Sequence, residues 1–479
     1  MRILFIRDDY VLWYPVGILY LSGSLRKAGH ETRLAYGNHA DFLDVVAEYK
    51  PNVLAYYVTT GFHRKYISLN SRIKRELPEL NAFSVFGGPH ATFFPEMIEE
   101  PDVDAVCRGE GEIAFLELVD RLAKNSDYEK SPNFWVKTPQ GIVKNPIAHL
   151  VEDLDSLPYP DHDLVYNADP LTDRVSAKVF FPIRGCPYKC TYCFNHSIHK
   201  LYEGKGSWVR AHSVDYVLND MERVKTAHPM KFVRLVSDTF NLIPEWLEEF
   251  RDKYPKRIGV PFTANVRAKL VTDRMARNLA EAGCMWACMG VESGVDWYRN
   301  ELLKRGDTRE QITSAAKLLH KHGIRIITQN IVGLPGETFE EALESMKLAA
   351  ECEPDYAWAA IYTPYPRTDL AEYARKEGYY DGNPDFVLKD FYTQSALKFR
   401  RPGDKARIEN LHKLFGLLVE FPALRPLAGT LAGLPLTTLY SLLHTVWWGY
   451  AQNKRLMPYK IGMGDYMRTV IRFMQKCHY

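Results

Sequence analysis

The chain has 479 residues, enough for two or three domains, and its composition of 46% hydrophobic and 25% charged residues is typical of a folded protein. Its formal net charge of +2, with no long basic tract, argues against a nucleic-acid partner. The apolar run that ends at Ile6 is too short for a signal peptide. We therefore expect a cytoplasmic, reducing location, in which the cysteines are ligands or free thiols and not disulfides.

The first third of the chain alternates predicted strands with predicted helices. The helix expected at residues 15–28 has apolar residues at helical spacing, and Pro15 suits its first turn. A second helix is expected at residues 69–77. This alternation predicts an α/β fold in which residues 1–130 form a doubly wound, Rossmann-like parallel sheet. The predicted strands are residues 2–6, 32–36, 53–58 and 82–86.

Polar and glycine-rich loops follow these strands. Parallel sheets bind ligands at the carboxyl ends of their strands, and glycine lets the backbone approach a ligand closely. We therefore expect a ligand-binding edge made of Thr59, Thr60, Gly87, Gly88, Pro89, His90, Gly109 and Glu110.

A polar, proline-rich segment at residues 131–175 is predicted to link this domain to a second alternating series at residues 176–385. Six strands are expected there, at residues 177–184, 232–237, 261–265, 286–291, 324–331 and 356–362. Six strand–helix units predict a partial (β/α)6 barrel, and barrels carry their chemistry where the strands end. A binding site and ordinary polar strand ends are both consistent with the residues at those ends. These residues are Cys186, Asp238, Asn265, Arg267, Glu292, Ser293, Gln329, Asn330, Tyr365 and Arg367.

The last part of the chain, residues 386–479, is predicted to be a helical domain. Residues 426–453 contain no Asp, Glu, Lys or Arg, and Trp447 and Trp448 lie near the end of this segment. The segment is long enough to span a bilayer, but it also contains a proline, a histidine and several threonines. Three interpretations stay open: a buried helical hairpin, an element that contacts a membrane surface, and a membrane span.

Three cysteines, Cys186, Cys190 and Cys193, lie within eight residues of the sequence "RGCPYKCTYCFNH" (184–196). Thiolates at this density bind soft metals. Structural zinc prefers four ligands, and the other close pair, Cys284 and Cys288, lies at the start of a predicted strand, where it is poorly placed to supply the fourth. A four-iron cluster held by only three cysteines would leave one iron open to another ligand.

This stretch resembles the radical S-adenosylmethionine (SAM) enzymes, and the resemblance covers roughly residues 177–385. In that family three cysteines hold a [4Fe–4S] cluster, and the amino and carboxylate groups of SAM chelate the fourth iron. The resemblance implies that Tyr192 lies on the adenine side and that Asp238 of "SDTF" contacts the methionine amine. It also implies that Glu292 and Ser293 of "GVESG" lie near the ribose or methionine, and that the segment with Gln329 and Asn330, "QNIVGLPGET", packs on the adenine. In "TPYPRT", Arg367 replaces a frequent glycine.

The N-terminal domain resembles the cobalamin-binding domain of one large subgroup of these enzymes. The resemblance lies in "YPVGILYLSGSLRKAGHE" (14–31), "FGGPHATFFPE" (86–96) and "VDAVCRGEGEIAFLEL" (103–118). It implies that the loops after the strands hold the corrin edge or nucleotide tail. The first loop, residues 7–17, contains no histidine, so we expect base-off cobalamin with no histidine ligand to cobalt.

The resemblance implies a class B methyltransferase-like enzyme. It would methylate an unactivated carbon or phosphorus centre of a small-molecule or lipid substrate, through a 5′-deoxyadenosyl radical and methylcobalamin. Such an enzyme would draw electrons from a donor such as flavodoxin or ferredoxin. Tyr365, Arg267 and Arg367 are the candidate catalytic residues. One alternative is a redox enzyme with the same cofactors that catalyses oxidative cyclisation or ring rearrangement. Another is a non-catalytic cobalamin- or cluster-binding sensor.

Overall fold

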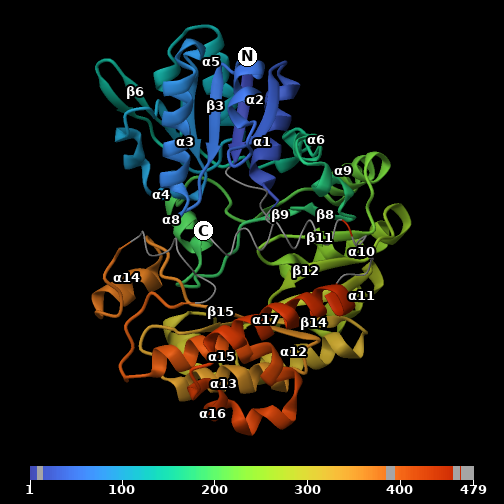
Figure 1. Ribbon diagram of the computed structural model, residues 1–479. Helices are drawn as coiled ribbons and strands as arrows, with labels where there is room; N and C mark the ends of the chain where they lie inside the picture. The colour runs from blue at the N-terminus through green and yellow to red at the C-terminus, as the bar shows by residue number, and fades with distance from the viewer. Residues whose placement is uncertain (8–13, 384–393, 457–463, 465–479) are drawn as a thin grey trace.

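The computed structural model describes residues 1–7, 14–383, 394–456 and 464 (Figure 1). An N-terminal sheet domain, a partial barrel and a set of C-terminal helices follow one another along the chain. The expected boundary between residues 385 and 386, like the loop at residues 8–13, lies outside the described residues.

The N-terminal domain is the doubly wound parallel sheet that the sequence predicts. Five parallel strands lie in the order β2-β1-β3-β4-β5. Helices α1 and α5 pack on one face of the sheet through Ile18 and Leu118, and α2 and α3 pack on the other through Val46 and Ile73. The elements are β1 (Arg2–Arg7), α1 (Val16–Lys27), β2 (Glu31–Tyr36), α2 (Phe42–Tyr49), β3 (Val53–Tyr57), α3 (His63–Glu76), β4 (Phe83–Gly87), β5 (Ala105–Cys107) and α5 (Glu112–Ala123).

The sheet extends beyond the boundary expected at residue 130. Strands β6 (Phe134–Thr138) and β7 (Gly141–Lys144) form a hairpin that adds two antiparallel strands next to β5. The remainder of the expected linker contains α6 (Asp163–Ala168) and α7 (Pro170–Arg174), and Leu164 and Val165 are buried in the main hydrophobic core. Residues 131–175 are therefore part of the folded body.

The second domain is the predicted partial barrel, with six parallel strands in the order β8-β11-β12-β13-β14-β15. Its first strand is shorter than expected: Pro182, which has no N–H for a ladder bond, separates β8 (Ala177–Phe180) from the short β9 (Ile183–Arg184). Strand β9 pairs with β10 (Arg210–Ala211) instead. The other strands are β11 (Phe232–Leu235), β12 (Phe262–Val266), β13 (Cys284–Glu292), β14 (Arg325–Val332) and β15 (Tyr356–Ile361).

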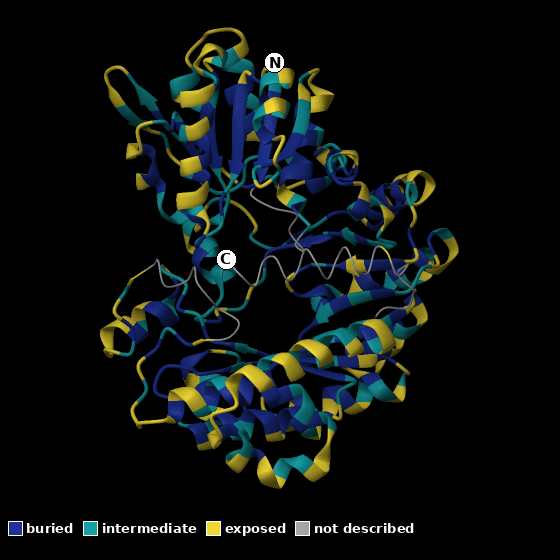
Figure 2. Ribbon diagram, viewed as in Figure 1, coloured by how far each residue is buried: buried dark blue, intermediate teal, exposed yellow. Residues whose placement is uncertain are grey.

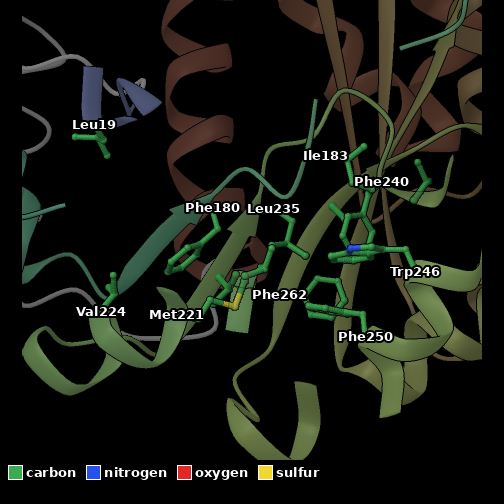
Figure 3. Close-up of a cluster of buried hydrophobic side chains, with 14 of the residues drawn as sticks. Leu19, Phe180, Ile183, Met221, Val224, Leu235, Phe240, Trp246, Phe250 and Phe262 are labelled. Carbon is green, nitrogen blue, oxygen red and sulfur yellow. The ribbon is translucent and has the colours of Figure 1, made fainter. Parts of the chain in front are cut away.

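Helices cover the outside of the barrel. Figure 3 shows Phe180, Leu235 and Phe262 of the strands beside Met221 of α9 and Phe250 of α10 in one buried cluster. Because alternate residues of each strand face outward, these apolar side chains fill the space between sheet and helices. The helices are α9 (Val214–Ala227), α10 (Pro244–Arg257), α11 (Asp273–Ala282), α12 (Arg309–Lys321) and α13 (Phe339–Glu351).

The C-terminal helices pack against one edge of the barrel. Leu411 and Phe415 of α15 lie in a core with Ala357 and Ile361 of β15. The helices here are α15 (Asp404–Glu420), α16 (Ala428–Gly433) and α17 (Thr437–Ala451). Helix α14 (Asp369–Lys376) precedes them and packs in a separate cluster with Tyr298 and Leu302. Within the described ranges, each helix is too short or too polar to cross a bilayer.

Candidate functional site

The loop with the three cysteines is held in a tight conformation at the end of the first barrel strand. Gly185 has φ +83°, and a Cβ at this position would lie 2.2 Å from the Trp208 carbonyl oxygen, so only glycine fits. The Trp208 indole donates to the Cys186 carbonyl at 3.1 Å. The Cys193 amide donates to the Cys190 carbonyl at 3.1 Å, and Cys193 then precedes helix α8 (Phe194–Leu201).

The three thiols lie close together in a partly buried setting. Cys190 is buried and Cys186 and Cys193 are half-buried, and none of the three forms a disulfide. Burial raises the pKa of Cys193 to about 12, and the negative charges of Asp238 and the other two cysteines act in the same direction. Because a bound cation favours the thiolate form, iron would reverse this shift.

The cysteine loop fits a four-iron cluster better than a single metal ion. Among the described residues, no three His, Cys, Asp or Glu side chains gather around one ion position. Each cysteine of a cluster binds its own iron, so the sulfur atoms need not converge on one point. Cys284 and Cys288 lie within strand β13 and form no metal-binding knuckle: Cys284 is buried, and the Cys288 Sγ lies 3.7 Å from the Thr263 hydroxyl.

Asp238 lies beside the cysteine loop, as expected for a residue at the end of the second barrel strand. Its carboxylate accepts hydrogen bonds from the Asn195 side chain and from the Gly185 backbone. Burial raises the pKa of Asp238, and these two hydrogen bonds oppose that shift. A carboxylate held in this way could bind a ligand amine next to the cluster.

Buried Glu292 and half-buried Tyr192 form a hydrogen-bonded pair. The Tyr192 hydroxyl donates to Glu292 Oε1 at 2.9 Å, and Arg305 Nη1 lies 3.6 Å from the same oxygen. Burial raises the pKa of Glu292, whereas Arg305 and Tyr192 lower it. Glu292 has φ +62°, a strained conformation for a non-glycine residue, which points to a functional role.

Two residues that the sequence analysis did not single out complete this region. In the sequence, Arg305 and Asp307 follow the helical turn Trp297–Leu302 and precede α12, so neither comes directly after a strand. The Asp307 carboxylate lies 3.2 Å from Arg305 Nε and 3.5 Å from Arg267 Nη2, and it is completely buried. Arg267 Nη1 in turn lies 3.9 Å from Cys190 Sγ. No motif spacing in the sequence marks Arg305 or Asp307.

Arg267 therefore contacts the cysteine loop at two residues. Besides its approach to Cys190, its guanidinium lies 3.5 Å from the centre of the Tyr188 ring, within the same loop. A cation over an aromatic face, next to a thiolate, would hold the loop in place and add positive charge beside the cluster.

The side chains of Ser293 and Asn330 form hydrogen bonds with the backbone of the protein itself. Both are fully buried. The Ser293 hydroxyl accepts from the Val295 amide at 3.3 Å, and the Asn330 amide donates to the Trp358 carbonyl at 2.8 Å. Gln329 is half-buried and faces the opposite side of β14 from Asn330. The roles predicted for these three residues in SAM binding stay predictions.

The glycine loop after β4 folds tightly against the loop after β3. Gly88 has φ +95°, and a Cβ there would lie 2.9 Å from the Val58 carbonyl oxygen. Gly88 follows Gly87, the last residue of β4, and precedes the short helix α4 (Pro89–Phe93). The Thr60 hydroxyl lies 3.2 Å from His90 Nδ1, and burial lowers the His90 pKa to about 3, so this histidine is neutral. Thr59 precedes Thr60 on the same half-buried loop.

Gly109 and Glu110 contact the barrel domain instead of lining an open edge. A Cβ on Gly109 would collide with the Tyr202 hydroxyl, to which the Glu110 amide donates at 2.6 Å. The Glu110 carboxylate pairs with Arg210 at 2.5 Å. Nearby, Arg184 at the start of the cysteine loop pairs with Glu112 of α5 at 2.7 Å. These contacts join the two domains, and a role for Gly109 and Glu110 in cobalamin binding stays a prediction.

The two domains also meet through aromatic side chains at the cysteine loop. Phe93 of α4 lies 5.3 Å from Phe194 of α8, measured between ring centroids, and Phe194 lies 5.5 Å from Tyr365 after β15. The Arg367 guanidinium lies 5.4 Å from the Phe94 ring centroid. The carboxyl ends of the N-terminal strands therefore face the cysteine loop (Figure 1).

Comparisons with known proteins agree with this architecture. Residues 180–349 match the model of the radical SAM superfamily, and residues 5–119 match that of the B12 binding domain. An uncharacterised methyltransferase of Pyrococcus horikoshii is 31% identical over 368 residues, which cover 75% of this chain and 78% of the relative. An anaerobic magnesium-protoporphyrin IX monomethyl ester cyclase of Rubrivivax gelatinosus is 28% identical, covering 77% of this chain and 69% of the relative.

A solved structure shares the fold over almost the whole chain. It is that of TsrM from Kitasatospora setae, a radical SAM methyltransferase with tryptophan substrate and a SAM analogue bound. The TM-score is 0.69 at 16% identity, covering 94% of this chain and 99% of the other.

Proposed function

This chain belongs to the cobalamin-dependent radical SAM enzymes, and from that premise we propose that it methylates an unactivated carbon or phosphorus centre of a small-molecule or lipid substrate. The observation that carries the proposal is the position of the cysteine loop. Phe194, directly after the third cysteine, packs on Phe93 of the B12 binding domain. A substrate held between these two domains would therefore meet both cofactors.

When bound, the cluster supplies an electron that cleaves SAM, and cobalamin carries the methyl group. The protein positions these groups and keeps water away from them. Cys186, Cys190 and Cys193 would hold three irons, and Asp238 would bind the methionine amine. Glu292, with its hydrogen bond from Tyr192, would orient the remainder of SAM. Tyr365 and Arg367, at the contact between the domains, are the residues that would touch the substrate.

Each methylation would consume two molecules of SAM and two electrons. One SAM gives its methyl group and becomes S-adenosylhomocysteine, and the other is reduced to methionine and 5′-deoxyadenosine, which takes the hydrogen that leaves the substrate. The electrons would come from a low-potential donor such as flavodoxin or ferredoxin. Equal yields of the two nucleoside products per methylated product are therefore the signature of this reaction.

A redox reaction without methyl transfer is the second candidate, because a relative of similar coverage is named as a cyclase. It would use the same cofactors but form deoxyadenosine without S-adenosylhomocysteine. A non-catalytic sensor would form neither product.

The test is anaerobic turnover after reconstitution with iron, sulfide and cobalamin. With methyl-labelled SAM and a low-potential reductant, we expect deoxyadenosine, S-adenosylhomocysteine and labelled methylcobalamin, measured by mass spectrometry. Cys190→Ala should abolish deoxyadenosine, whereas Cys352→Ala, which changes another buried free thiol outside the loop, should not. Deoxyadenosine without cobalt methylation would favour the redox reaction, and the absence of both products would overturn the enzymatic proposal.

A further inference from the structure

The inside of the barrel is less tightly filled than its outside. Burial alternates along β14: Ile326, which packs under the helices, is buried, whereas Ile327 and Gln329 are only half-buried. Strand β12, and β15 from Ala357 onward, alternate in the same way, and the barrel strands in Figure 2 are coloured as both buried and intermediate. A closed barrel normally fills its interior with side chains. The alternation therefore indicates that the inside of this partial barrel has room for a ligand.

A charged side chain, that of Arg234 on β11, lies on this inner face. The next residue, Leu235, packs outward against the helices (Figure 3). Phe232, two residues before Arg234, lies in a buried cluster with Trp286 of β13 and Tyr356 of β15. These three strands are not neighbours in the sheet, so their side chains meet inside the barrel. Because alternate residues of a strand share a face, Arg234 points inward as well.

The protein itself does not neutralise the charge of Arg234. The residue is exposed, and among the described parts of the chain no carboxylate lies within ion-pair distance of it. Three other arginines of the barrel domain each pair with an aspartate: Arg267, Arg299 and Arg305. A guanidinium stays charged in proteins, so its position inside the barrel costs free energy unless water or a ligand solvates it.

The surroundings of Arg234 suit an anion that carries an apolar body. Thr263 is its register partner on β12, and the Thr263 hydroxyl lies 3.7 Å from Cys288 Sγ. Burial raises the pKa of Cys288, whereas the Thr263 hydroxyl and the charge of Arg234 oppose this shift, which indicates that the guanidinium lies near the thiol. Toward the starts of the strands, Trp447 and Trp448 of α17 pack on the aromatic cluster and complete an apolar floor.

We infer that Arg234 binds an anionic group of the substrate, a carboxylate or a phosphate, inside the barrel. Guanidinium groups bind both of these anions through paired N–H donors. The inference rests on the proposed function, in which the reacting centre of the substrate lies beside SAM. Arg234 comes four residues before Asp238, so the two residues are at most about 14 Å apart. A substrate with its acidic group this far from its reacting centre, or nearer, would contact Arg234 and SAM together.

The inference can be tested by alkylation of Cys288 in the full, reconstituted chain, measured by peptide mass spectrometry. Iodoacetate is negatively charged, and iodoacetamide has nearly the same size without the charge. Arg234→Gln should lower the ratio of the iodoacetate rate to the iodoacetamide rate about tenfold, because a change in the thiol pKa affects both reagents alike. Arg234→Lys keeps the charge and should retain most of the ratio. Arg277→Gln, at an exposed position on the outer helix α11, is the matched control and should keep the wild-type ratio.

Competing anions then identify the group that Arg234 binds. At constant ionic strength, inorganic phosphate or acetate should slow iodoacetate labelling of the wild type, and neither should slow labelling of Arg234→Gln. Stronger protection by phosphate would assign the substrate to the phosphate esters, and stronger protection by acetate would assign it to the carboxylic acids.

Four results would overturn the inference. Cys288 that reacts with neither reagent would show that the barrel interior is closed. An equal rate ratio in the wild type and Arg234→Gln, or no protection by either anion, would show that Arg234 binds no anion. A loss of several degrees in the unfolding temperature of Arg234→Gln would show that the arginine has a structural role instead. The labelling needs no turnover, so an inactive enzyme would not affect its result, and failure here would leave the proposed methylation to its own test.

Discussion

Asp307→Asn is the substitution that best tests how the protein controls the cluster. The carboxylate is fully buried between Arg267 and Arg305, at 3.5 and 3.2 Å. Asparagine keeps the shape but removes the negative charge that the two guanidinium groups share. Breaking a buried ion pair in this way costs about 3–5 kcal/mol, so we expect the variant to unfold at a lower temperature.

The same substitution changes the field at the cluster. Arg267 reaches from Asp307 to Cys190, which places the carboxylate within about 10 Å of the Cys190 sulfur. At this distance, and with an effective dielectric constant of about 20, one unit charge changes the free energy of adding an electron to the cluster by about 1.7 kcal/mol. Reduction adds negative charge to the cluster, so the loss of a nearby negative charge favours reduction. The potential should therefore rise by about 70 mV, since about 59 mV corresponds to a factor of ten for one electron.

The potential can be measured by a redox titration of the reconstituted enzyme, with the reduced cluster followed by electron paramagnetic resonance. A cluster with a higher potential is a weaker reductant, so deoxyadenosine formation should slow by up to about 15-fold. Asp296→Asn, which removes an exposed carboxylate paired with Arg299, is the control and should leave the potential unchanged. A folded Asp307→Asn variant with the wild-type potential would refute the reasoning.

Three further outcomes are expected. Cys190→Ala should lose the visible absorbance of the cluster after reconstitution, and retained absorbance would mean that Cys190 is not a ligand. Gly88→Ala should release cobalamin on gel filtration, because its positive φ and the nearby Val58 carbonyl make alanine unfavourable by about 1–3 kcal/mol; full retention would contradict this. Burial raises the pKa of Glu337 to about 8, so its contribution to stability is full below about pH 4.5 and is lost as the pH rises to 8. In the Glu337→Gln variant, the unfolding temperature should therefore change less between pH 5 and 8 than in the wild type. Equal pH profiles for variant and wild type would show that the raised pKa of Glu337 is wrong.

The fold could be predicted well because its signals are local. Each of the six barrel strands was expected within a few residues, and α1 begins one residue after Pro15 as its spacing indicates. The sequence was misleading at residues 131–175, where proline and polar residues suggested a linker although β6 and β7 extend the sheet. A hairpin at a sheet edge has one exposed face, so its composition differs little from that of a loop.

The sequence alone predicted the cysteine loop, because its three candidate ligands lie within eight residues and their spacing limits what they can bind. The network around it was decided only by the tertiary structure. Asp307 reaches Arg267, and through it Cys190, across more than a hundred residues of chain, and Glu110 turns to Arg210 of the barrel. The exposed face of α17 was likewise decided by the tertiary structure. Which side of an apolar helix is buried depends on its neighbours, and packing between distant segments sets those neighbours.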